Sequence, residues 1–506
     1  MQTKRTLASL LTLLTLGSTL IACGSYDVEK EDSAGTSSKD SQSIVNDTED
    51  SAAETDSRQL TDLEIRQSID DGVTDVDFNE REFRILTRTE SNVRHYFVEG
   101  ETGDPCDTAV FRRNAKIEDR FNILIEADFV DDNAVLIDYV LNGQNEAELY
   151  ALWAYSMYKY VEAGVLANWH NVPVINLEQP WYNQYANKES TINDVLFALH
   201  SDLSISTLTG MMAIFFNDRL VQNYGIDKKA LYSLVDDGKW TIDALISYTK
   251  DIYEDLNQNN VRDNEDFFGF TLKLVEQTDI FPIAFDISYT SINADGQLDF
   301  TFESNLEKYN NAVAKIRDFI KLEGVWAEYH CPTSEKFING ETLFTALWFD
   351  YCFSELRNME DTYLILPYPK WDESQDSYYT TAQDEYELFC LPKTVPVDDY
   401  EFVGTIVEVL SAETYKSVYP AYYDAALKGR YSKEPETAEM IDLIMDGARL
   451  EFAFQFGSSY FNRLPYLFRE LMNDNVLQVA TSWTMIKRVI DAKVVNNGKF
   501  YDLFVD

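Results

Sequence analysis

Basic side chains are scarce in this chain. Its 506 residues include 42 Lys and Arg against 87 Asp and Glu, which gives a formal net charge of −45. Nucleic-acid binding depends on Lys and Arg clustered at the phosphates, and an anionic bilayer surface repels a protein of this charge. The composition therefore excludes both kinds of partner. Because the acidic surplus is spread along the chain, we interpret it as a source of solubility outside a cell rather than as a cation-binding feature.

Histidine is rare as well, and the sequence lacks the common catalytic motifs. It contains no HExxH, GxSxG, P-loop or GxGxxG pattern, which argues against ordinary hydrolases and against nucleotide cofactors. We expect the four histidines, His95, His170, His200 and His330, to be structural. The chain is thus predicted not to be an enzyme. A cell-surface glycan hydrolase stays open as an alternative, because it needs only two carboxylates about 5 to 10 Å apart.

The chain has 5 cysteines, too few for a disulfide framework, and none of them forms a CxxC or Cys/His metal spacing. Four of them follow the N-terminal region: Cys106, Cys331, Cys352 and Cys390. In an oxidising compartment these four can pair in three ways. They can equally remain free and buried, and the sequence does not distinguish these alternatives.

Aromatic residues, in contrast, are abundant. The chain has 8 Trp, 31 Tyr and 30 Phe, and 45% of its residues are hydrophobic. This content is typical of a globular protein with a large core, so disorder throughout is excluded. The length allows two or three domains.

The N-terminus has the pattern of a bacterial lipoprotein signal. Lys4 and Arg5 precede an apolar run from Leu7 to Ala22, which is short for a membrane span but typical of a secretory signal. The run ends at Cys23, in a segment that resembles a lipobox, so residues 1–22 are predicted to be a lipoprotein signal peptide and Cys23 the diacylglycerol- and palmitate-bearing anchor. The alternative is a plain signal peptide.

An acidic segment follows the signal. Between Gly24 and Leu60 there are ten acidic residues, three basic ones and one aromatic, a composition that cannot bury enough surface to fold. We therefore predict a disordered tether over residues 23–77 and folded sequence from about Phe78 onward.

The folded sequence alternates between strand-like and helix-like patterns. A short strand near Phe83 is followed by a helix over Ala109–Phe121 and a second strand over Ile123–Phe129, which is a β-α-β order. A second block begins near Ala213, with a helix over Thr241–Leu256 capped by Thr241. Further helices are expected over 309–322 and 436–454, and Leu366–Pro369 is an extended crossing segment. The alternation predicts an α/β fold with helices covering a sheet.

One loop has the spacing of a calcium site. Side-chain oxygens at positions 1, 3, 5, 9 and 12 and a main-chain carbonyl at position 7 are offered by Asp255, Asn257, Asn259, Asp263, Asp266 and Val261. Asn260 stands at position 6, where Gly is usual, and position 12 is Asp rather than the longer Glu. We expect a structural Ca²⁺ here. The alternative is a polar surface loop.

Several segments together resemble the extracellular solute-binding proteins of bacterial carbohydrate ABC importers, the class that includes maltose-binding-protein-like receptors. In chain order the segments are Ala109–Asn114, Pro180–Asn183, Phe216–Leu220, Gly238–Thr241, Phe337–Thr342 with Trp348, Leu366–Lys370 and Tyr419–Tyr423. They cover almost the whole mature chain, and the calcium-like loop follows the Gly238–Thr241 element, where a subgroup of this family often carries an Asp/Asn-rich loop.

The resemblance implies a two-lobed periplasmic-binding-protein-like fold with a hinge between the lobes. The implied lobes are 78–210 plus 341–395 and 211–340 plus 396–506. It also implies a monomer on the outer face of the bacterial cytoplasmic membrane, attached only through its lipid. Such a receptor captures a carbohydrate, most simply an oligosaccharide, and delivers it to ABC permease subunits. A receptor for a peptide or another non-sugar solute is the second alternative.

Cleft residues are expected among aromatic and polar side chains near strand ends and loops. Sugars present apolar ring faces and hydroxyl groups, which suit aromatic rings and carboxylates. The candidates are Trp348, Asp350, Trp181, Tyr182, Arg88, Glu90, Asp202, Tyr378 and Tyr379. For Trp348 the alternative is packing in the core, and for the Trp181–Tyr182 pair it is that the two side chains pin a loop onto a lobe. For Asp202 and for Tyr378 and Tyr379 the alternative is exposure to solvent.

Overall fold

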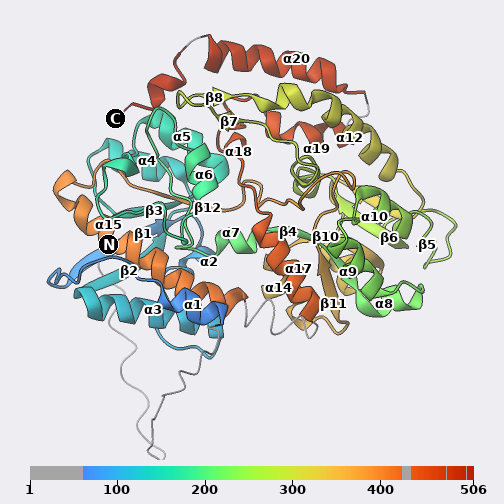
Figure 1. Ribbon diagram of the computed structural model, residues 1–506, viewed down its shortest axis with the longest axis horizontal. Coiled ribbons are helices and arrows are strands. Elements are labelled where there is room, and N and C mark those ends of the chain that lie inside the picture. The colour runs from blue at the N-terminus through green and yellow to red at the C-terminus, as the bar shows by residue number, and fades with distance from the viewer. Residues whose placement is uncertain (1–60, 424–434, 474–475, 497, 506) are drawn as a thin grey trace, which may run out of the picture. The chain divides into compact units, whose positions relative to one another are not determined.

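Two separate β-sheets organise the folded part of the chain. The computed structural model describes residues 61–423, 435–473, 476–496 and 498–505. Residues Leu60–Asp506 form one compact unit. Within that unit, Figure 1 shows the two sheets in different halves, each with helices packed around it. We refer to the two halves as the first and second lobes.

The first lobe contains the predicted β-α-β unit. Its sheet has the order β12 (Glu387–Cys390), β3 (Leu149–Trp153), β1 (Arg81–Thr87) and β2 (Ile123–Phe129). Strand β1 is parallel to β2 and β3, whereas β12 is antiparallel to β3. The helix α3 (Pro105–Phe121) lies between β1 and β2 in sequence, and Asp104 caps it by accepting hydrogen bonds from two main-chain N–H groups. The predicted helix over Ala109–Phe121 is therefore confirmed and begins four residues earlier.

The second lobe is built on a six-stranded sheet, four of whose strands are buried along almost their whole length. Strand β6 (Phe267–Lys273) is parallel to β9 (Val325–Glu328) and β10 (Thr342–Trp348) and antiparallel to the short β5 (Tyr253–Glu254). On the other side of β10, β4 (Met212–Asn217) and then β11 (Tyr363–Leu366) continue the sheet in antiparallel pairs. Continuous apolar runs of this kind suit a sheet that is covered on both faces. A small hairpin, β7 (Ser291–Ile292) and β8 (Leu298–Asp299), stands apart.

Helices follow most of the strands. Those that precede the second lobe in sequence are α1 (Asp62–Ser68), α2 (Glu90–Val93), α4 (Asn133–Leu141), α5 (Met157–Ala163), α6 (Gln184–Glu189) and α7 (Ser206–Thr209). The next are α8 (Asp218–Asn223), α9 (Lys228–Asp236), α10 (Ile242–Thr249), α11 (Ile280–Ala284), α12 (Leu306–Phe319), α13 (Thr333–Ile338) and α14 (Asp350–Phe353). The last are α15 (Tyr400–Glu413), α17 (Pro435–Asp446), α18 (Ala453–Phe456), α19 (Leu467–Asn473) and α20 (Val479–Ile490). Two predicted helices are therefore too long, because α10 ends at Thr249 and α17 at Asp446.

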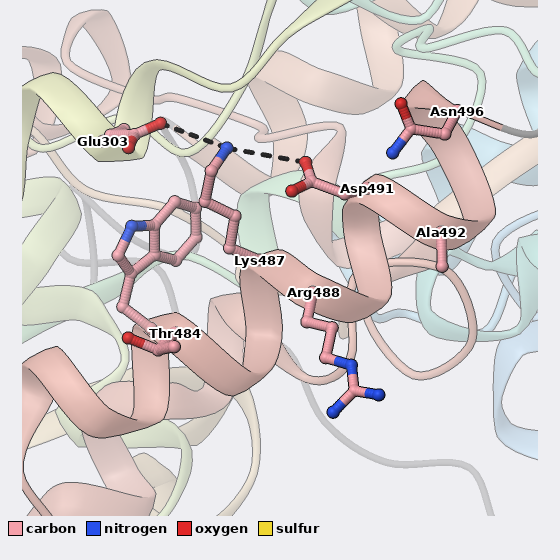
Figure 2. Close-up of a pocket in the computed structure, with 8 residues that line it drawn as sticks. Glu303, Thr484, Lys487, Arg488, Asp491, Ala492 and Asn496 are labelled. Atoms are coloured by element: carbon pink, nitrogen blue, oxygen red, sulfur yellow. Dashed lines mark hydrogen bonds and ion pairs between the residues drawn. The ribbon is translucent and has the colours of Figure 1, made fainter.

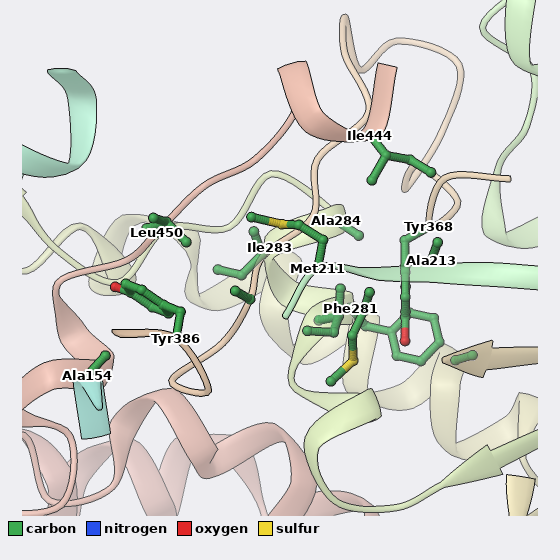
Figure 3. Close-up of a cluster of buried hydrophobic side chains, with 14 of the residues drawn as sticks. Ala154, Met211, Ala213, Phe281, Ile283, Ala284, Tyr368, Tyr386, Ile444 and Leu450 are labelled. Atoms are coloured by element: carbon green, nitrogen blue, oxygen red, sulfur yellow. The ribbon is translucent and has the colours of Figure 1, made fainter. Parts of the chain in front are cut away.

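The last segment of the chain contacts both lobes. Helix α18 packs against α5, whereas α19 and α20 pack against α12. Buried side chains from distant parts of the sequence meet where the chain passes between the lobes, among them Met211, Phe281, Tyr368 and Tyr386 (Figure 3). A second buried cluster lies in the first lobe, where the ring of Phe402 on α15 meets that of Phe83 on β1 edge to face. The lobes are thus joined by packed segments rather than by a bare linker.

The strand pairing corrects the predicted lobe boundaries. The ranges 341–395 and 396–506 were expected in the first and second lobes, but β10 and β11 lie in the second sheet, and α15 packs on the first. The physical reason is that β4 pairs with β10 and β11, so its two hydrogen-bonding edges hold residues 342–348 and 363–366 in the second lobe. The chain therefore crosses between the lobes at points that local patterns do not mark.

The ordered structure also begins earlier than predicted. Residues 61–77 were expected in the tether, yet they include α1, whose N-terminus is closed by a capping box between Thr61 and Glu64. Arg120 on α3 binds Asp71 and Asp75, which ties this segment to the first lobe. The signal peptide, Cys23 and the rest of the predicted tether lie outside the described residues.

The four cysteines of the described chain are free and buried: Cys106, Cys331, Cys352 and Cys390. Burial raises the pKa of the Cys352 thiol to about 12 and has the same effect on Cys106 and Cys331. The thiols are therefore protonated at neutral pH and unreactive. The second of the two alternatives left open by the sequence is the one that the structure shows.

Candidate ligand-binding cleft

The carboxyl ends of the parallel strands bring polar and aromatic side chains from both lobes together. Arg88 directly follows β1, and Trp153 ends β3. In the second lobe Trp348 ends β10, and Glu276 follows β6 in a short 3-10 helix. Open α/β sheets bind ligands at this edge. Residues 383–385, which we call the crossing segment, lie where the chain passes from β11 in the second lobe to β12 in the first.

The first lobe contributes an aromatic pair. The rings of Trp153 and Tyr155 have centroids 5.6 Å apart and are tilted by 53°. The guanidinium of Arg88 lies 5.0 Å from the ring centroid of Trp153 and 6.0 Å from that of Tyr155. Both rings are half-buried, so each leaves part of its surface open. These cation–π contacts hold Arg88 against both rings, so the three side chains form one surface of the first lobe.

The second lobe contributes a second aromatic pair. Trp348 and Tyr351 are stacked, with centroids 5.8 Å apart and an interplanar angle of 24°. The indole N–H of Trp348 is buried, and it has no hydrogen-bond partner within the described part of the chain. Beside this pair, Asp350 accepts a hydrogen bond from the Ser354 hydroxyl at 3.3 Å, and burial raises the pKa of its carboxyl. The charges of Arg94 and His95 in the first lobe act on Asp350 in the opposite direction, so the two lobes are near each other at this point.

Carboxylates lie near both aromatic pairs, because the charge of Glu276 acts on Tyr351 and on Glu385, and Arg88, which contacts Trp153, also acts on Glu385. Lys273 donates to Glu276 at 2.7 Å. Glu385, on the crossing segment, is exposed to solvent, and yet burial by the surrounding protein raises the pKa of its carboxyl to about 7. Asp384 and Glu276 add to this rise, whereas Arg469 and Arg88 oppose it. An exposed carboxylate that is surrounded by protein lies in a concave surface, so Glu385 marks the floor of a cleft between the lobes.

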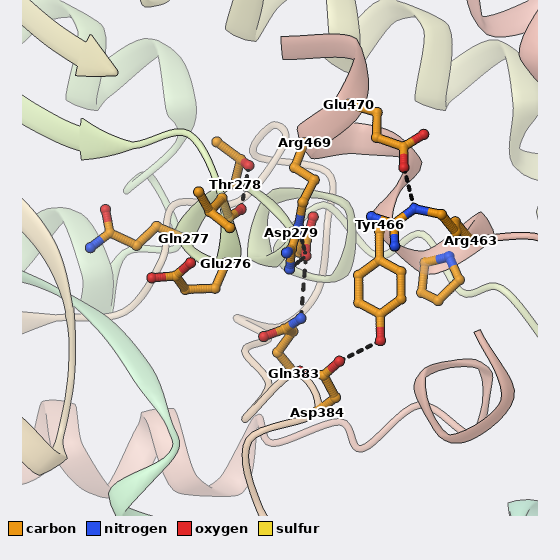
Figure 4. A network of polar contacts seen from close by, with 12 residues as sticks. Glu276, Gln277, Thr278, Asp279, Gln383, Asp384, Arg463, Tyr466, Arg469 and Glu470 are labelled. Atoms are coloured by element: carbon orange, nitrogen blue, oxygen red, sulfur yellow. Dashed lines mark hydrogen bonds and ion pairs between the residues drawn. The ribbon is translucent and has the colours of Figure 1, made fainter. Parts of the chain in front are cut away.

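A polar network lies behind the floor of the cleft and holds it in place. Figure 4 shows Arg469 on α19 bound to Asp279, and Tyr466 bound to Asp384. Nε of Arg469 donates to Asp279 Oδ2 at 2.7 Å, and the Gln383 amide donates to the same oxygen at 3.4 Å. Asp279 is completely buried, and its other oxygen, Oδ1, has no donor among the described residues. The network joins the C-terminal segment, the 3-10 helix of Glu276 and the crossing segment.

The lobes also meet at the rim of the cleft. The guanidinium of Arg357, which follows α14, lies 3.8 Å from the carboxylate of Asp104 at the start of α3. Close by, the rings of Phe353 and Tyr422 meet edge to face with centroids 5.5 Å apart. These two contacts join side chains of different lobes on the side away from the C-terminal segment.

Three of the predicted ligand residues lie at the cleft, namely Arg88, Trp348 and Asp350. Trp181 and Tyr182 do not, because both are buried in the first lobe and donate to the Glu408 carboxylate at 3.1 and 2.7 Å. The pair therefore pins its loop onto the first lobe, which is the alternative given above.

The remaining candidates are also placed elsewhere. Tyr378 is buried, and its hydroxyl lies between the main chains of Trp240 and Val235. Tyr379 is covered by Arg449, which lies 3.3 Å from its ring centroid. Asp202 lies beside Trp181 and within range of the Arg66 charge, and burial raises its pKa to about 7. Glu90 is exposed at the first position of α2.

Several cleft residues were missed from the sequence: Trp153, Tyr155, Glu276, Tyr351 and Glu385. The sequence from residue 152 to residue 166 has a helix-like pattern, which conceals the end of β3 at Trp153. The signal for Trp153 and Tyr155 was the buried run Leu149–Leu152 directly before them. Glu276 and Glu385 carry no local signal, because only the fold brings them together.

The calcium-like loop is ordered by its own hydrogen bonds. The Asp255 carboxylate accepts from the main-chain N–H groups of Asn259 and Asn260 at 3.2 and 2.8 Å. Asn260 has φ +57°, the left-handed conformation that usually calls for Gly at this position. Asp266 is fully buried, and its Oδ1 has no donor within the described chain. Over the same residues, no group of three or more His, Cys, Asp or Glu is gathered in a way that could hold a metal ion.

A surface hollow lies away from the cleft, beside α20. It has a volume of about 550 Å³ and is lined by Trp483, Lys487 and Arg488, among others (Figure 2). Lys487 bridges Glu303 at 3.3 Å and Asp491 at 3.5 Å, so the hollow is crossed by satisfied ion pairs. We do not assign the ligand site to it.

The overall structure resembles known binding proteins. The maltose/maltodextrin-binding domain of Bdellovibrio bacteriovorus, bound to maltotriose, superposes with a TM-score of 0.50 at 10% identity, over 82% of this chain and 99% of that one. The chain has the two-lobed fold of that domain. An ABC substrate-binding protein of Listeria monocytogenes in complex with cycloalternan matches with a TM-score of 0.49 at 11% identity, over 82% of this chain and 98% of that one. A solute-binding protein of Thermotoga lettingae bound to α-D-tagatose matches at 0.48 and 12% identity, over 81% and 99%.

These likenesses concern the fold. No protein-family model matches the chain, and no curated protein matches its sequence. The predicted α/β two-lobed architecture is confirmed. In the described part of the chain, none of the helices combines the length and the apolar character that a bilayer crossing needs.

Proposed function

We propose that this protein is an extracellular receptor that captures a carbohydrate, most simply an oligosaccharide, in the cleft between its lobes. The observation that carries the proposal is that each lobe contributes an aromatic pair, Trp153–Tyr155 on one and Trp348–Tyr351 on the other, with carboxylates near both pairs. Sugar rings stack on aromatic faces, and their hydroxyls donate to carboxylates. The fold shared with a domain that is bound to maltotriose supports the same ligand class.

We also propose that the receptor is held at the outer face of the bacterial cytoplasmic membrane by lipid on Cys23, as a monomer, and passes its ligand to ABC permease subunits. The signal-like run Leu7–Ala22 before Cys23 supports the anchor. The acidic segment that follows supports a tether long enough to keep the folded unit above the bilayer. Metabolic labelling with a palmitate analogue tests the anchor, and Cys23→Ser should abolish the label.

The cleft also contains an arrangement that a glycan hydrolase could use. Glu385, with a pKa of about 7, is positioned near the second carboxylate Glu276, and a glycosidase needs a protonated acid beside an ionised carboxylate. We favour binding without chemical change because Glu276 is already paired with Lys273, a partner that lowers its value as a nucleophile. The two functions differ in whether the bound glycan is cut.

The test is a glycan screen on the compact unit Leu60–Asp506, read first by thermal shift and then by calorimetry. A binding protein is stabilised by its ligand in proportion to the logarithm of ligand concentration, and each hit should be recovered intact by chromatography. Trp153→Ala and Trp348→Ala should abolish the shift, whereas Tyr185→Ala, at an exposed tyrosine of α6, should keep it. Cleavage of a hit would establish the hydrolase instead, and a screen without hits would point to peptides or other solutes.

For the loop 255–266 we propose a structural Ca²⁺ site, supported by the left-handed Asn260 and by the unpaired oxygen of the buried Asp266. Binding would draw the carboxylates of Asp255, Asp263 and Asp266 toward one ion and would leave the cleft unchanged. Calcium should then raise the melting temperature of the wild type but not of Asp255→Asn. Identical melting curves in calcium and in chelator would remove the proposal.

A further inference from the structure

The carboxylates of the cleft differ in what already binds them. Glu276 accepts from Lys273 at 2.7 Å, and Asp384 accepts from the Tyr466 hydroxyl. Asp350 is exposed and accepts from the Ser354 hydroxyl at 3.3 Å. The Glu385 side chain is also exposed in the cleft but, in contrast, has no hydrogen-bond or ion-pair partner among the described residues. The cleft floor therefore presents one acidic group whose donor has to come from outside the protein.

The cations near Glu385 are each held by another group. Arg469 is bound to Asp279, Lys273 to Glu276, and the Arg88 guanidinium lies against the rings of Trp153 and Tyr155. A second acceptor without a donor, Oδ1 of the fully buried Asp279, belongs to the same network (Figure 4). Two acids, Asp384 and Glu276, and two cations, Arg469 and Arg88, act on Glu385. These four charges balance one another, so the charge of an ionised Glu385 is left without compensation.

We propose that the cleft selects a saccharide that carries a protonated amine, a basic amino sugar, and that Glu385 is the residue that binds its ammonium group. This inference rests on the proposed carbohydrate-binding function and names the class of sugar. It concerns the local balance of charge in the cleft and not the net charge of the chain, which is spread over the surface.

Physical chemistry favours an ammonium over a neutral hydroxyl at this position. An ionised carboxylate strengthens the hydrogen bond from either donor, but only an ammonium adds the attraction between two opposite charges. A cation also removes the repulsion that Asp384 and Glu276 exert on Glu385, which a hydroxyl cannot do. The aromatic pairs are compatible with either ligand, because an ammonium group is also attracted to the face of a Trp or Tyr ring.

Proton release distinguishes the two cases. The pKa of Glu385 is about 7 in the free protein, raised by burial and then by its acidic neighbours. At pH 6 its carboxyl is therefore mostly protonated. An ammonium ligand stabilises the ionised form and expels that proton, so binding at pH 6 should release close to one proton per ligand. A neutral saccharide, which does not favour the ionised form in this way, should release far less.

The experiment uses the mature chain from residue 24 onward and three probes: a glucosamine tetramer, its N-acetylated counterpart and maltotetraose. Calorimetry at pH 6 in two buffers of different ionisation enthalpy gives both the affinity and the number of protons released. The glucosamine tetramer should bind at least about tenfold more tightly than the N-acetylated form and release close to one proton. In Glu385→Gln the preference and the proton release should both disappear while neutral binding persists. Glu439→Gln, which removes the same charge from an exposed position on α17, should retain both.

The outcomes separate this inference from the function on which it rests. Equal affinity for the free-amine and N-acetylated tetramers, or a preference that survives Glu385→Gln, overturns the inference and leaves a neutral-sugar receptor. If spermidine binds and none of the three saccharides does, both the inference and the proposed function are overturned. If none of the four compounds binds, both are likewise overturned for this class of ligand.

Discussion

Two glutamates of this protein stand two positions apart in the chain and have opposite environments. Glu387 is fully buried at the start of β12, and Glu385 is exposed in the cleft. Burial alone would raise the pKa of Glu387, but the charge of His95 and the hydrogen bonds from its neighbours hold it below its ordinary value. The pKa of Glu385 is raised to about 7. The more deeply buried carboxylate is thus the one that ionises more easily.

The difference lies in the donors that the first lobe supplies. At distances of 2.6 to 3.0 Å, Glu387 accepts hydrogen bonds from the side chains of Thr87, Asn92, Tyr96 and Ser204. Glu385 has no such donor within the described chain. A buried carboxylate whose donors are all internal is part of the framework, whereas one without donors has an affinity that a ligand can use. The comparison therefore separates structural from functional acids more clearly than burial does.

The largest expected effect comes from removing the Glu387 carboxylate, whose hydrogen-bond donors all lie within the protein. Glu387→Ala leaves three buried donors and the half-buried amide of Asn92 without their acceptor, and it should lower the free energy of unfolding by about 3 kcal/mol. Glu385→Ala, at an exposed position without partners, should not lower it, because the raised pKa of Glu385 means that its charge opposes folding at neutral pH. Urea unfolding followed by circular dichroism measures both. Equal losses in the two variants would contradict the distinction between the two glutamates.

The tryptophans extend the comparison to the aromatic residues. Trp348→Ala should weaken saccharide binding by about 10- to 100-fold, because it removes a stacking surface, while leaving the fold intact. Trp181→Phe should do the reverse. It removes the indole N–H that binds the Glu408 carboxylate and should lower stability by about 1 to 2 kcal/mol without changing affinity. Calorimetry and thermal melting of the two variants, side by side, test this exchange of effects.

The sequence was sufficient for the local elements of the fold. The alternation around Phe83 and the helix before Phe121 predicted the β-α-β unit, and Thr241 correctly marked the start of α10. The lobe boundaries failed because β4 pairs with β10 across more than a hundred residues. The register of such a pair depends on the packing of the whole sheet and has no local pattern.

The candidate site likewise contains some residues that the sequence predicted and others that it could not. Arg88, Trp348 and Asp350 were predicted because each stands at the end of a strand that the sequence shows. Glu385 could not be recognised among so many acidic residues, since its raised pKa depends on Glu276 and on burial by both lobes. Trp181 and Tyr182 were predicted as ligand residues, but they lie in the first lobe. In sequence, a Trp–Tyr pair in a loop looks the same whether its partner is a ligand or, as here, Glu408.

A smaller effect should appear in the pH dependence of stability. The folded-state pKa of Glu385, about 7, exceeds its ordinary value of 4.5, so the folded protein binds more protons than the unfolded chain between these values. This group therefore stabilises the fold as the pH falls from 7 toward 4.5. For Glu387 the folded pKa is depressed, so its stabilising contribution is present above pH 4.5 and is lost as the pH falls below it.

Melting temperatures from pH 8 to pH 4, compared between wild type and Glu385→Gln, isolate the first contribution. Glu408 and Glu451, whose pKa values are also raised to about 7, contribute equally to both proteins and cancel in the difference. The variant should gain less stability than the wild type between pH 7 and pH 5. A variant with an unchanged profile would show that Glu385 has an ordinary pKa and would remove the contrast with Glu387.

The smallest effect is expected at the rim, where each partner of an ion pair belongs to a different lobe. Arg357 and Asp104 are partly exposed, and such pairs contribute at most about 1 kcal/mol. Unlike Glu387, whose partners all lie within one lobe, this pair forms only when the lobes are close, so its contribution should appear in ligand affinity rather than in stability. Asp104→Asn is the suitable variant, because Asn retains the cap of α3 and removes only the charge.

Arg357→Ala and Asp104→Asn should each weaken saccharide binding by up to about fivefold, and the double variant by no more than either alone. High salt should weaken the wild type to the level of the variants, because the pair is screened. Additive losses in the double variant would mean that the two side chains act separately. In that case the 3.8 Å contact between Arg357 and Asp104 does not help to close the cleft, and the lobes are held together only by their buried contacts.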